Sequence, residues 1–247
     1  MKRFIETLQN IWKIEDLRKR LITTILFVMV YRFGSYIVLP GINPANLEAL
    51  QNQTSGGLLG LLDMFSGGAF SHASIFALGI MPYISASIVV QLLGIAVPYF
   101  QKMQREGESG RKKMNQITRY LTVLILLFQS PAYLVTLSVQ LGHVGAALPQ
   151  SFWFQITSVI ILTAGSMFIM WLGERITDKG VGNGISFIIM VGIIARFPTA
   201  IVQEFASRLG DAAGGLVMFI GEIVCLLFVI ALCILLVQGT RKVPVQY

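Results

Sequence analysis

Long apolar runs alternate with short polar connections along the chain. About 20 apolar residues are needed to cross the hydrocarbon core of a bilayer as a helix, and a spanning helix bonds its own backbone groups where no water is available. Six runs meet this requirement: residues 21–39, 74–97, 120–140, 153–172, 185–203 and 216–237. The pattern predicts an all-α, polytopic membrane helix bundle.

Composition supports a membrane location over a soluble one. Hydrophobic residues make up 55% of the 247 residues and charged residues 13%, whereas soluble domains are about 45–50% apolar and about a quarter charged. The net charge of +7 would favour nucleic-acid binding in a soluble protein. Here, however, the basic residues gather in short stretches between the apolar runs, which is typical of membrane topology. Cys225 and Cys233 lack the spacing of metal ligands, and we expect no metal site.

The basic residues also predict the orientation, because lysine and arginine are enriched on the cytoplasmic side. Sixteen of the 19 fall in alternate connections: before the first run, between the second and third, after the fourth and after the sixth. The opposite connections contain only Arg208. Both termini are therefore expected in the cytoplasm, with residues 1–20 as an amphipathic segment at the membrane interface.

A seventh apolar run, residues 58–70, is too short to span and contains Asp63 and the pair Gly67-Gly68. If it crossed the membrane, every later connection would change sides, against the charge pattern. Irregular backbone at membrane depth is tolerated only where protein buries it or where it lines a water-filled cavity. We therefore expect a re-entrant segment at an extracytoplasmic funnel. An amphipathic helix on the outer surface is the alternative.

Charged residues within or beside the apolar runs are costly and usually face protein or water. Arg32 and Arg196 lie near the outer ends of their runs, where snorkelling to the interface is the favoured interpretation and lining the funnel is the alternative. Glu222 has no obvious partner; a neighbouring subunit or an arginine would satisfy it. Asn183, between two glycines, is expected to cap the fifth helix.

Four stretches resemble the SecY family of protein-conducting channels, in the order and at the separations found there. They are MFSGGAFSHASIFALGIMPYISASIVVQLL (64–93), EGESGRKK (106–113), MWLGERITDKGVGNGIS (170–186) and the terminal QGTRKVPVQY. The resemblance implies a SecY-type channel of ten spans in two inverted five-helix halves around a pore, an organisation of internal repeats. This chain would supply helices 1 to 6 and a short re-entrant plug helix. The expected divisions are residues 1–20, residues 21–203 with the plug, and residues 204–247 with the sixth helix and the start of a cytoplasmic loop.

The resemblance also implies roles for individual residues. An apolar pore ring, which would exclude ions by dewetting, corresponds to Ile80, Ile84 and Ile189. Residues four apart share a helix face, and Pro82 between the first two is expected to bend the helix. The plug would comprise Leu58, Leu59, Leu61, Leu62, Asp63, Met64, Phe65, Ser66, Gly67 and Gly68. A lateral gate into the lipid would use Ser85, Ser87, Ile88, Gln91, Leu92 and Gln129. Contacts with cytoplasmic partners would use Arg105, Arg111, Lys112, Lys113, Arg241 and Lys242.

The function implied by this resemblance is that of the central pore-forming subunit of the Sec translocon in the bacterial plasma membrane. Such a subunit passes unfolded preproteins across the membrane and membrane proteins sideways into it, with signal peptides, nascent chains and lipids as contacts. SecE and SecG would be partner subunits, and the SecA ATPase or the ribosome would act from the cytoplasm.

The chain has no P-loop pattern, so we expect a passive channel with no cofactor, no enzymatic activity and no nucleic-acid substrate. A secondary transporter or a non-conducting scaffold is the alternative. A transporter predicts a carboxylate ion site, for which the sequence offers little beyond Glu222, and a scaffold would leave the glycine-rich segment without a purpose.

Overall fold

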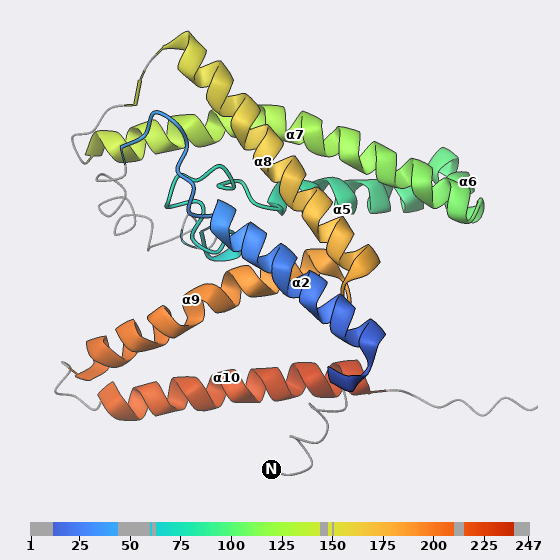
Figure 1. The fold of residues 1–247 in the computed structure, drawn as a ribbon. Coiled ribbons are helices and arrows are strands. Elements are labelled where there is room, and N and C mark those ends of the chain that lie inside the picture. Colours follow the sequence, from blue (N-terminus) through green and yellow to red (C-terminus); the bar gives the residue numbers. More distant parts are fainter. Residues whose placement is uncertain are drawn as a thin grey trace, which may run out of the picture. The chain divides into compact units, whose positions relative to one another are not determined.

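The computed structural model describes residues 12–43, 60, 63–143, 148–149, 151–209 and 215–239. Its principal helices are α2 (Glu15–Gly34), α5 (Met81–Ala96), α6 (Pro98–Arg105), α7 (Glu108–His143), α8 (Phe152–Lys179), α9 (Gly184–Leu209) and α10 (Gly215–Gln238) (Figure 1). The chain divides into two compact units, Met1–Arg196 and Phe197–Tyr247. The all-α prediction is confirmed.

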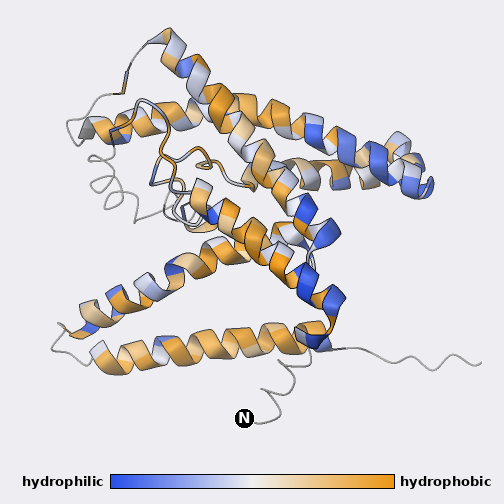
Figure 2. Cartoon of the chain, viewed as in Figure 1, coloured by the Kyte–Doolittle hydropathy of each residue, from blue (hydrophilic) through white to orange (hydrophobic). Residues whose placement is uncertain are grey.

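Four of the described helices, α7 to α10, are long and apolar enough to cross a membrane. The pair α5 and α6 counts as a fifth if it is one broken span. Within the first unit, hydrophilic residues gather at the N-terminal ends of α2 and α7 and at the C-terminal end of α8 (Figure 2). This distribution agrees with a multi-pass membrane protein whose consecutive spans run in opposite directions.

The first predicted span, residues 21–39, is only partly helical. Helix α2 begins at Glu15 and ends at Gly34. Because its first turns are charged, it is not among the helices that are long and apolar enough to cross a membrane. Residues 35–36 form a turn, and the chain beyond them pairs with the segment that precedes α5. Val38 forms an antiparallel bridge with Ser74, the N–H of Leu39 donates to the carbonyl of Ala73 (2.8 Å), and the N–H of Ile75 donates to the carbonyl of Ile37 (3.0 Å).

The second predicted span, residues 74–97, also begins later than expected. Residues 66–80 form turns, and α5 begins at Met81 with Ile80 as its N-cap. Pro82 therefore lies in the first helical turn, where its missing N–H would have no helical partner, so the predicted bend at Pro82 is wrong. The bend of 98° lies between α5 and α6. Val97 there is extended (φ −110°, ψ 122°), because Pro98 disfavours the helical region for the residue before it.

Two apolar clusters form the core of the first unit, and the coil of residues 63–80 contributes to both. One cluster includes Leu39, Phe70, Ala73, Ala77, Tyr133, Leu134, Leu137 and Leu162. The other includes Tyr31, Ala69, Phe76, Ile80, Ile169, Leu172, Ile176 and Ile188. Helices pack around this coil in the pairs α5 with α7, α7 with α8, and α8 with α2. The irregular segment is therefore the centre of the unit.

The turn between α8 and α9 is fixed by side-chain caps. The Oδ1 of Asn183 accepts the N–H groups of Ile185 (3.1 Å) and Ser186 (3.4 Å), which confirms the predicted cap. The N–H of Gly184 donates to the Oγ1 of Thr177 (2.9 Å). These bonds set the direction in which α9 leaves the turn, and α9 carries one of the predicted ring residues.

Helix α8 can pass the coil closely only because residue 165 is glycine. A Cβ at Gly165 would collide with the carbonyl oxygen of Ile75, whereas a Cβ at Gly142 on α7 would meet no atom within 4 Å. We expect Gly165→Ala to destabilise the protein by about 1–3 kcal/mol, the usual cost of overpacking. Gly142→Ala should be neutral or stabilising, since alanine favours helix more than glycine does. Thermal unfolding in mild detergent measures both, and equal midpoints would contradict this account.

Candidate functional site

The three predicted ring residues lie in one apolar cluster. Ile80, at the N-cap of α5, is 5% exposed, and Ile84 and Ile189 are half-buried against the same cluster. The carbonyl of Ile80 accepts the N–H of Ile84 (3.1 Å), so the two side chains are one helical turn apart. Ile188 on α9 is almost fully buried in the same cluster. Sequence reasoning missed Ile188, although its spacing of four from both Gly184 and Gly192 marks the buried face of α9.

The described part of the predicted plug lies against this cluster. Residues 63–65 form a helical turn that leads into the turns of residues 66–73. Asp63, Ser66, Gly67 and Gly68 are buried, whereas Met64 and Phe65 are exposed. Ala69, which follows directly, is fully buried among the ring residues. The other predicted plug residues, Leu58, Leu59, Leu61 and Leu62, lie outside the described residues.

Two glycines let the coil turn and approach α9. Gly67 (φ +65°) and Gly68 (φ +93°) both have positive φ, a conformation that residues with a Cβ rarely adopt. A Cβ at Gly67 would lie 2.9 Å from the Cα of Gly192, and a Cβ at Gly192 would lie 3.1 Å from the carbonyl oxygen of Phe65. Coil and helix therefore meet backbone to backbone.

Hydroxyl groups from α2 and α7 bond the carbonyls of the coil. Tyr31 donates to the carbonyl of Ser66 (3.2 Å), and Tyr133 donates to the carbonyl of Phe70 (2.9 Å). Within the coil, the Oγ of Ser66 donates to the carbonyl of Asp63 (3.0 Å) and accepts the N–H of Phe70 (3.1 Å). These side-chain bonds add to the turn bonds that the same carbonyls accept within the coil, and together they satisfy backbone groups that would be costly if unbonded in an apolar interior.

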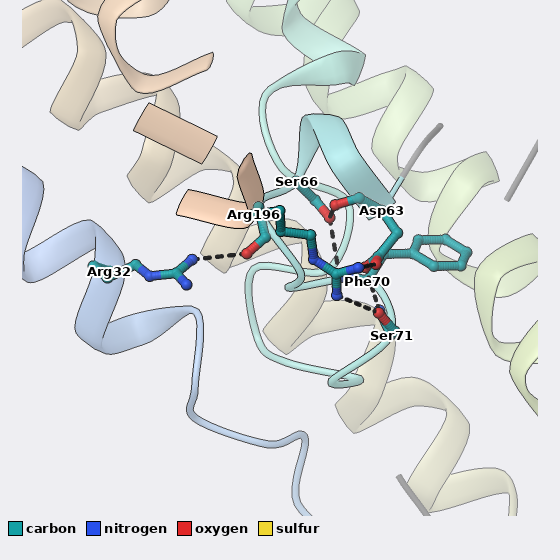
Figure 3. Close-up of polar contacts among 7 residues, drawn as sticks. Arg32, Asp63, Ser66, Phe70, Ser71 and Arg196 are labelled. Atoms are coloured by element: carbon teal, nitrogen blue, oxygen red, sulfur yellow. Dashed lines mark hydrogen bonds and ion pairs between the residues drawn. The ribbon is translucent and has the colours of Figure 1, made fainter. Parts of the chain in front are cut away.

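Two arginines hold the coil from different helices (Figure 3). Arg196 of α9 pairs with Asp63 (Nη1 to Oδ2, 2.5 Å) and donates to the Oγ of Ser71 (3.0 Å). The other carboxylate oxygen of Asp63 accepts the N–H of Ser71 (2.8 Å). Arg32 of α2 donates to the carbonyl of Gly67 (2.7 Å). The favoured interpretation of these arginines, snorkelling to the interface, is therefore wrong: both guanidinium groups bond to the coil.

The predicted lateral-gate residues of α5 lie mainly on its exposed face. Within the described part of the chain, Ser85, Ile88, Gln91 and Leu92 are exposed and Ser87 is half-buried, and Gln129 is exposed on α7. The opposite face of α5 buries Pro82, Ala86, Val90 and Gly94 at intervals of four. Gln91 donates to the Oγ of Ser87 (3.2 Å) in its own helix, so this polar pair is satisfied without another helix.

The predicted cytoplasmic contacts lie at the hairpin of α6 and α7. Arg105, Arg111, Lys112 and Lys113 are all exposed there, around a turn at Gly107 (φ +72°). Two of them pair with acids of the same hairpin: Lys112 with Glu108 (3.1 Å) and Lys113 with Glu106 (3.5 Å). The remaining two predicted contacts, Arg241 and Lys242, lie outside the described residues.

Glu222 finds its partner within the second unit. It pairs with Arg208 (2.8 Å), which also pairs with Glu204 (2.7 Å). Of the two partners considered, the arginine is the one observed. The carboxylate on which a transporter-like ion site would depend is thus already paired. Among the described residues, no group of three or more His, Cys, Asp and Glu side chains could hold a metal ion.

The stretch that contains the predicted ring residues, the predicted gate residues and the basic hairpin also matches a known family. The SecY family model matches residues 74–247, more than half of the 247 residues. The chain belongs to the SecY family.

The chain is also similar to individual SecY proteins, each named "Protein translocase subunit SecY". The Pseudomonas aeruginosa protein is 46% identical over 235 residues, covering 95% of this chain and 52% of the relative. The Escherichia coli K12 protein is 44% identical over 234 residues, covering 94% of this chain and 52% of the relative. The Buchnera aphidicola protein is 42% identical over 233 residues, covering 94% of this chain and 53% of the relative. The chain thus spans about half the length of these SecY relatives.

The bond from Tyr133 to the coil can be tested with a matched pair of substitutions. Tyr133→Phe removes this donor, while the carbonyl of Phe70 still accepts the N–H of Ala73 (3.2 Å). We expect a loss of about 0.5–1.5 kcal/mol, the usual net contribution of one hydrogen bond. Tyr120→Phe on the same helix removes a hydroxyl from a side chain that is 76% exposed and should have little effect. Denaturation in detergent compares the two, and a Tyr133→Phe variant as stable as Tyr120→Phe would refute the role given to this bond.

Proposed function

We propose that the protein is the central pore-forming subunit of a Sec translocon in the bacterial plasma membrane. It would conduct unfolded preproteins across the membrane and release membrane proteins sideways into it. The observation that carries this proposal is the packing of Ile80, Ile84 and Ile189 with Ala69 of the coil in one apolar cluster. The names of the SecY relatives support it.

The proposed mechanism needs no bond chemistry. A narrow ring of aliphatic side chains excludes water and therefore ions, but widens for a polypeptide. The first part of the coil, residues 63–71, acts as the plug. At rest it seals the ring from the extracytoplasmic side, and it moves away when a substrate enters. The protein is then a passive, non-enzymatic channel.

The exposed face of α5 is the proposed exit into lipid. Ser85, Ile88 and Leu92 on that face are solvent-accessible in the described structure, as expected of a surface that another helix covers and uncovers. Hydrogen bonds between membrane helices contribute only about 0.6–2 kcal/mol each, which suits a contact that opens repeatedly. A signal helix would leave the pore along this face.

The α6–α7 hairpin is the proposed docking site for the cytoplasmic motor, either the SecA ATPase or a ribosome. Its basic residues remain accessible even where they pair with neighbouring acids. SecE and SecG are the proposed partner subunits. The proposed divisions are residues 1–20 at the cytoplasmic interface, 21–203 as the first half with its plug, and 204–247 as the sixth helix and the start of a cytoplasmic loop.

The ring predicts a leak when its side chains are removed. In the complete protein reconstituted in planar lipid bilayers, the double substitution Ile80→Gly and Ile84→Gly should raise the ion conductance of the resting channel severalfold, because a wider and less apolar constriction is wetted. The matched control is Ile156→Gly with Ile160→Gly, two exposed isoleucines of α8 that are also four residues apart. Unchanged conductance in the ring variant, or an equal rise in the control, would contradict the proposal.

The proposed orientation predicts that Ser109 is cytoplasmic and Ser151 is extracytoplasmic. Both serines are exposed. Single Ser109→Cys and Ser151→Cys variants are made after Cys225 and Cys233 have been replaced by alanine. A membrane-impermeant thiol reagent added to intact spheroplasts should label only the second variant, and lysis should expose the first. Labelling of both variants before lysis would overturn this topology.

A further inference from the structure

We propose that Asp63, Arg196 and Arg32 form a latch that holds the coil of residues 63–71 in its resting place and couples its release to movement of α9. The inference rests on the proposed channel function and adds a specific control of the plug. It concerns an ion pair between the coil and a spanning helix, together with a second attachment from α2.

Asp63 is the part of the latch that belongs to the coil. Its side chain is 3% exposed, and both carboxylate oxygens have partners: the N–H of Ser71 and the guanidinium of Arg196. A buried charge that loses its partner is strongly destabilising. The carboxylate therefore cannot leave Arg196 and remain where it is. When the pair breaks, the coil must move until Asp63 reaches water.

Arg196 is the part of the latch that belongs to a spanning helix. It bonds both ends of the coil at once, through Asp63 and the Oγ of Ser71. Its guanidinium also lies over Gly68, where an added Cβ would be 3.0 Å from Nη2. The side chain is 36% exposed, so the arginine can stay in contact with water after the coil departs. Leaving Arg196 unpaired therefore costs less free energy than leaving the buried carboxylate of Asp63 unpaired would.

Helix α9 connects this ion pair to the ring. Gly192 lies three residues after Ile189 and Arg196 lies seven residues after it, a spacing that places all three along one helix face. The first packs in the ring cluster, the second touches the coil backbone and the third holds Asp63. A displacement of α9 that widens the ring also pulls the guanidinium from the carboxylate. One movement thus opens the constriction and frees the plug.

Arg32 provides the second attachment. It donates to the carbonyl of Gly67 (2.7 Å) and to the hydroxyl of Tyr36 (2.9 Å), and its guanidinium lies over the Tyr36 ring, 4.9 Å from the centroid. Its partner in the coil is a neutral carbonyl, so this bond is weaker than the ion pair. It steadies the coil against α2, while Arg196 decides when the coil leaves.

The test uses the complete protein in planar bilayers. Asp63→Asn keeps an oxygen to accept the N–H of Ser71 but removes the charge, and Arg196→Gln removes the other member of the pair. We expect each to raise resting ion conductance severalfold, and Arg32→Gln to raise it less. Residues that act as a pair are non-additive, so the double variant Asp63→Asn, Arg196→Gln should leak no more than the leakier single variant.

The control is an ion pair that touches no part of the coil. Arg119 on α7 and Glu174 on α8 pair at 2.6 Å, about the length of the latch pair. Glu174→Gln should leave conductance unchanged. A rise as large as that of Asp63→Asn would mean that any lost ion pair loosens the bundle, and the latch would be refuted.

A second measurement follows the coil directly. Ala69 is fully buried, so in protein with Cys225 and Cys233 replaced by alanine, an Ala69→Cys thiol should react slowly with an impermeant reagent added outside. Adding Asp63→Asn should speed labelling about tenfold, because the charge-assisted bonds that hold the coil to Arg196 lose their anionic acceptor and become weaker. Arg196→Lys retains the charge and should give an intermediate rate. If Asp63→Asn does not fold, the labelling rate of the Arg196→Lys variant provides the test.

The outcomes separate the latch from the channel. Conductance and labelling unchanged in the latch variants would overturn the latch. The Ile80→Gly, Ile84→Gly variant measured beside them then shows whether the channel proposal survives. If that variant leaks, the pore stands and only the latch fails; if it does not, both fail. Additive effects of Asp63→Asn and Arg196→Gln would overturn the pairing on which the latch depends.

Discussion

Irregular backbone can lie among apolar helices only if protein groups bond its polar atoms, and this constraint organises the first unit. The coil of residues 63–80 has no continuous helical ladder; turn bonds within it pair many of its N–H groups and carbonyls. The extended segment before it and side chains from α2 and α7 supply further partners. Helix α9 supplies an arginine and a glycine where the coil comes closest. The spanning helices thus carry their polar residues where the coil needs them.

The same coil carries apolar side chains into both core clusters, as the proposed sealing role of residues 63–71 would require. Ala69 and Phe76 pack beside Ile80, and Phe70 packs beside Tyr133. In the proposed channel, moving residues 63–71 away would expose the contacts of Ala69 and Phe70, so apolar burial would favour the closed state together with the bonds to Arg32 and Arg196. The proposed closure would then rest on two kinds of interaction, only one of which involves charge.

Much of the fold could be predicted from hydropathy, since long apolar runs between basic connections have few solutions other than spanning helices. The errors fall where an apolar stretch is not helical, at residues 35–39 and 74–80, because hydropathy does not distinguish an apolar coil from a helix. Pro82 carried a usable signal, as proline favours the first turn of a helix. The partnership of Asp63 with Arg196 joins positions distant in sequence, and no local pattern predicts it. The predicted ring residues came from family resemblance, and the structure shows that Ile188 is buried in the same apolar cluster.

The bend of 98° between α5 and α6 has a mechanical consequence. If α5 crosses the membrane, α6 runs almost along its surface, and α6 also packs on α7. A force applied along the axis of α6 then reaches α5 sideways, as a torque about Val97, instead of pushing it lengthwise through the bilayer. A motor pressing on the hairpin would thus tilt the exposed face of α5, with the pivot set by a single proline.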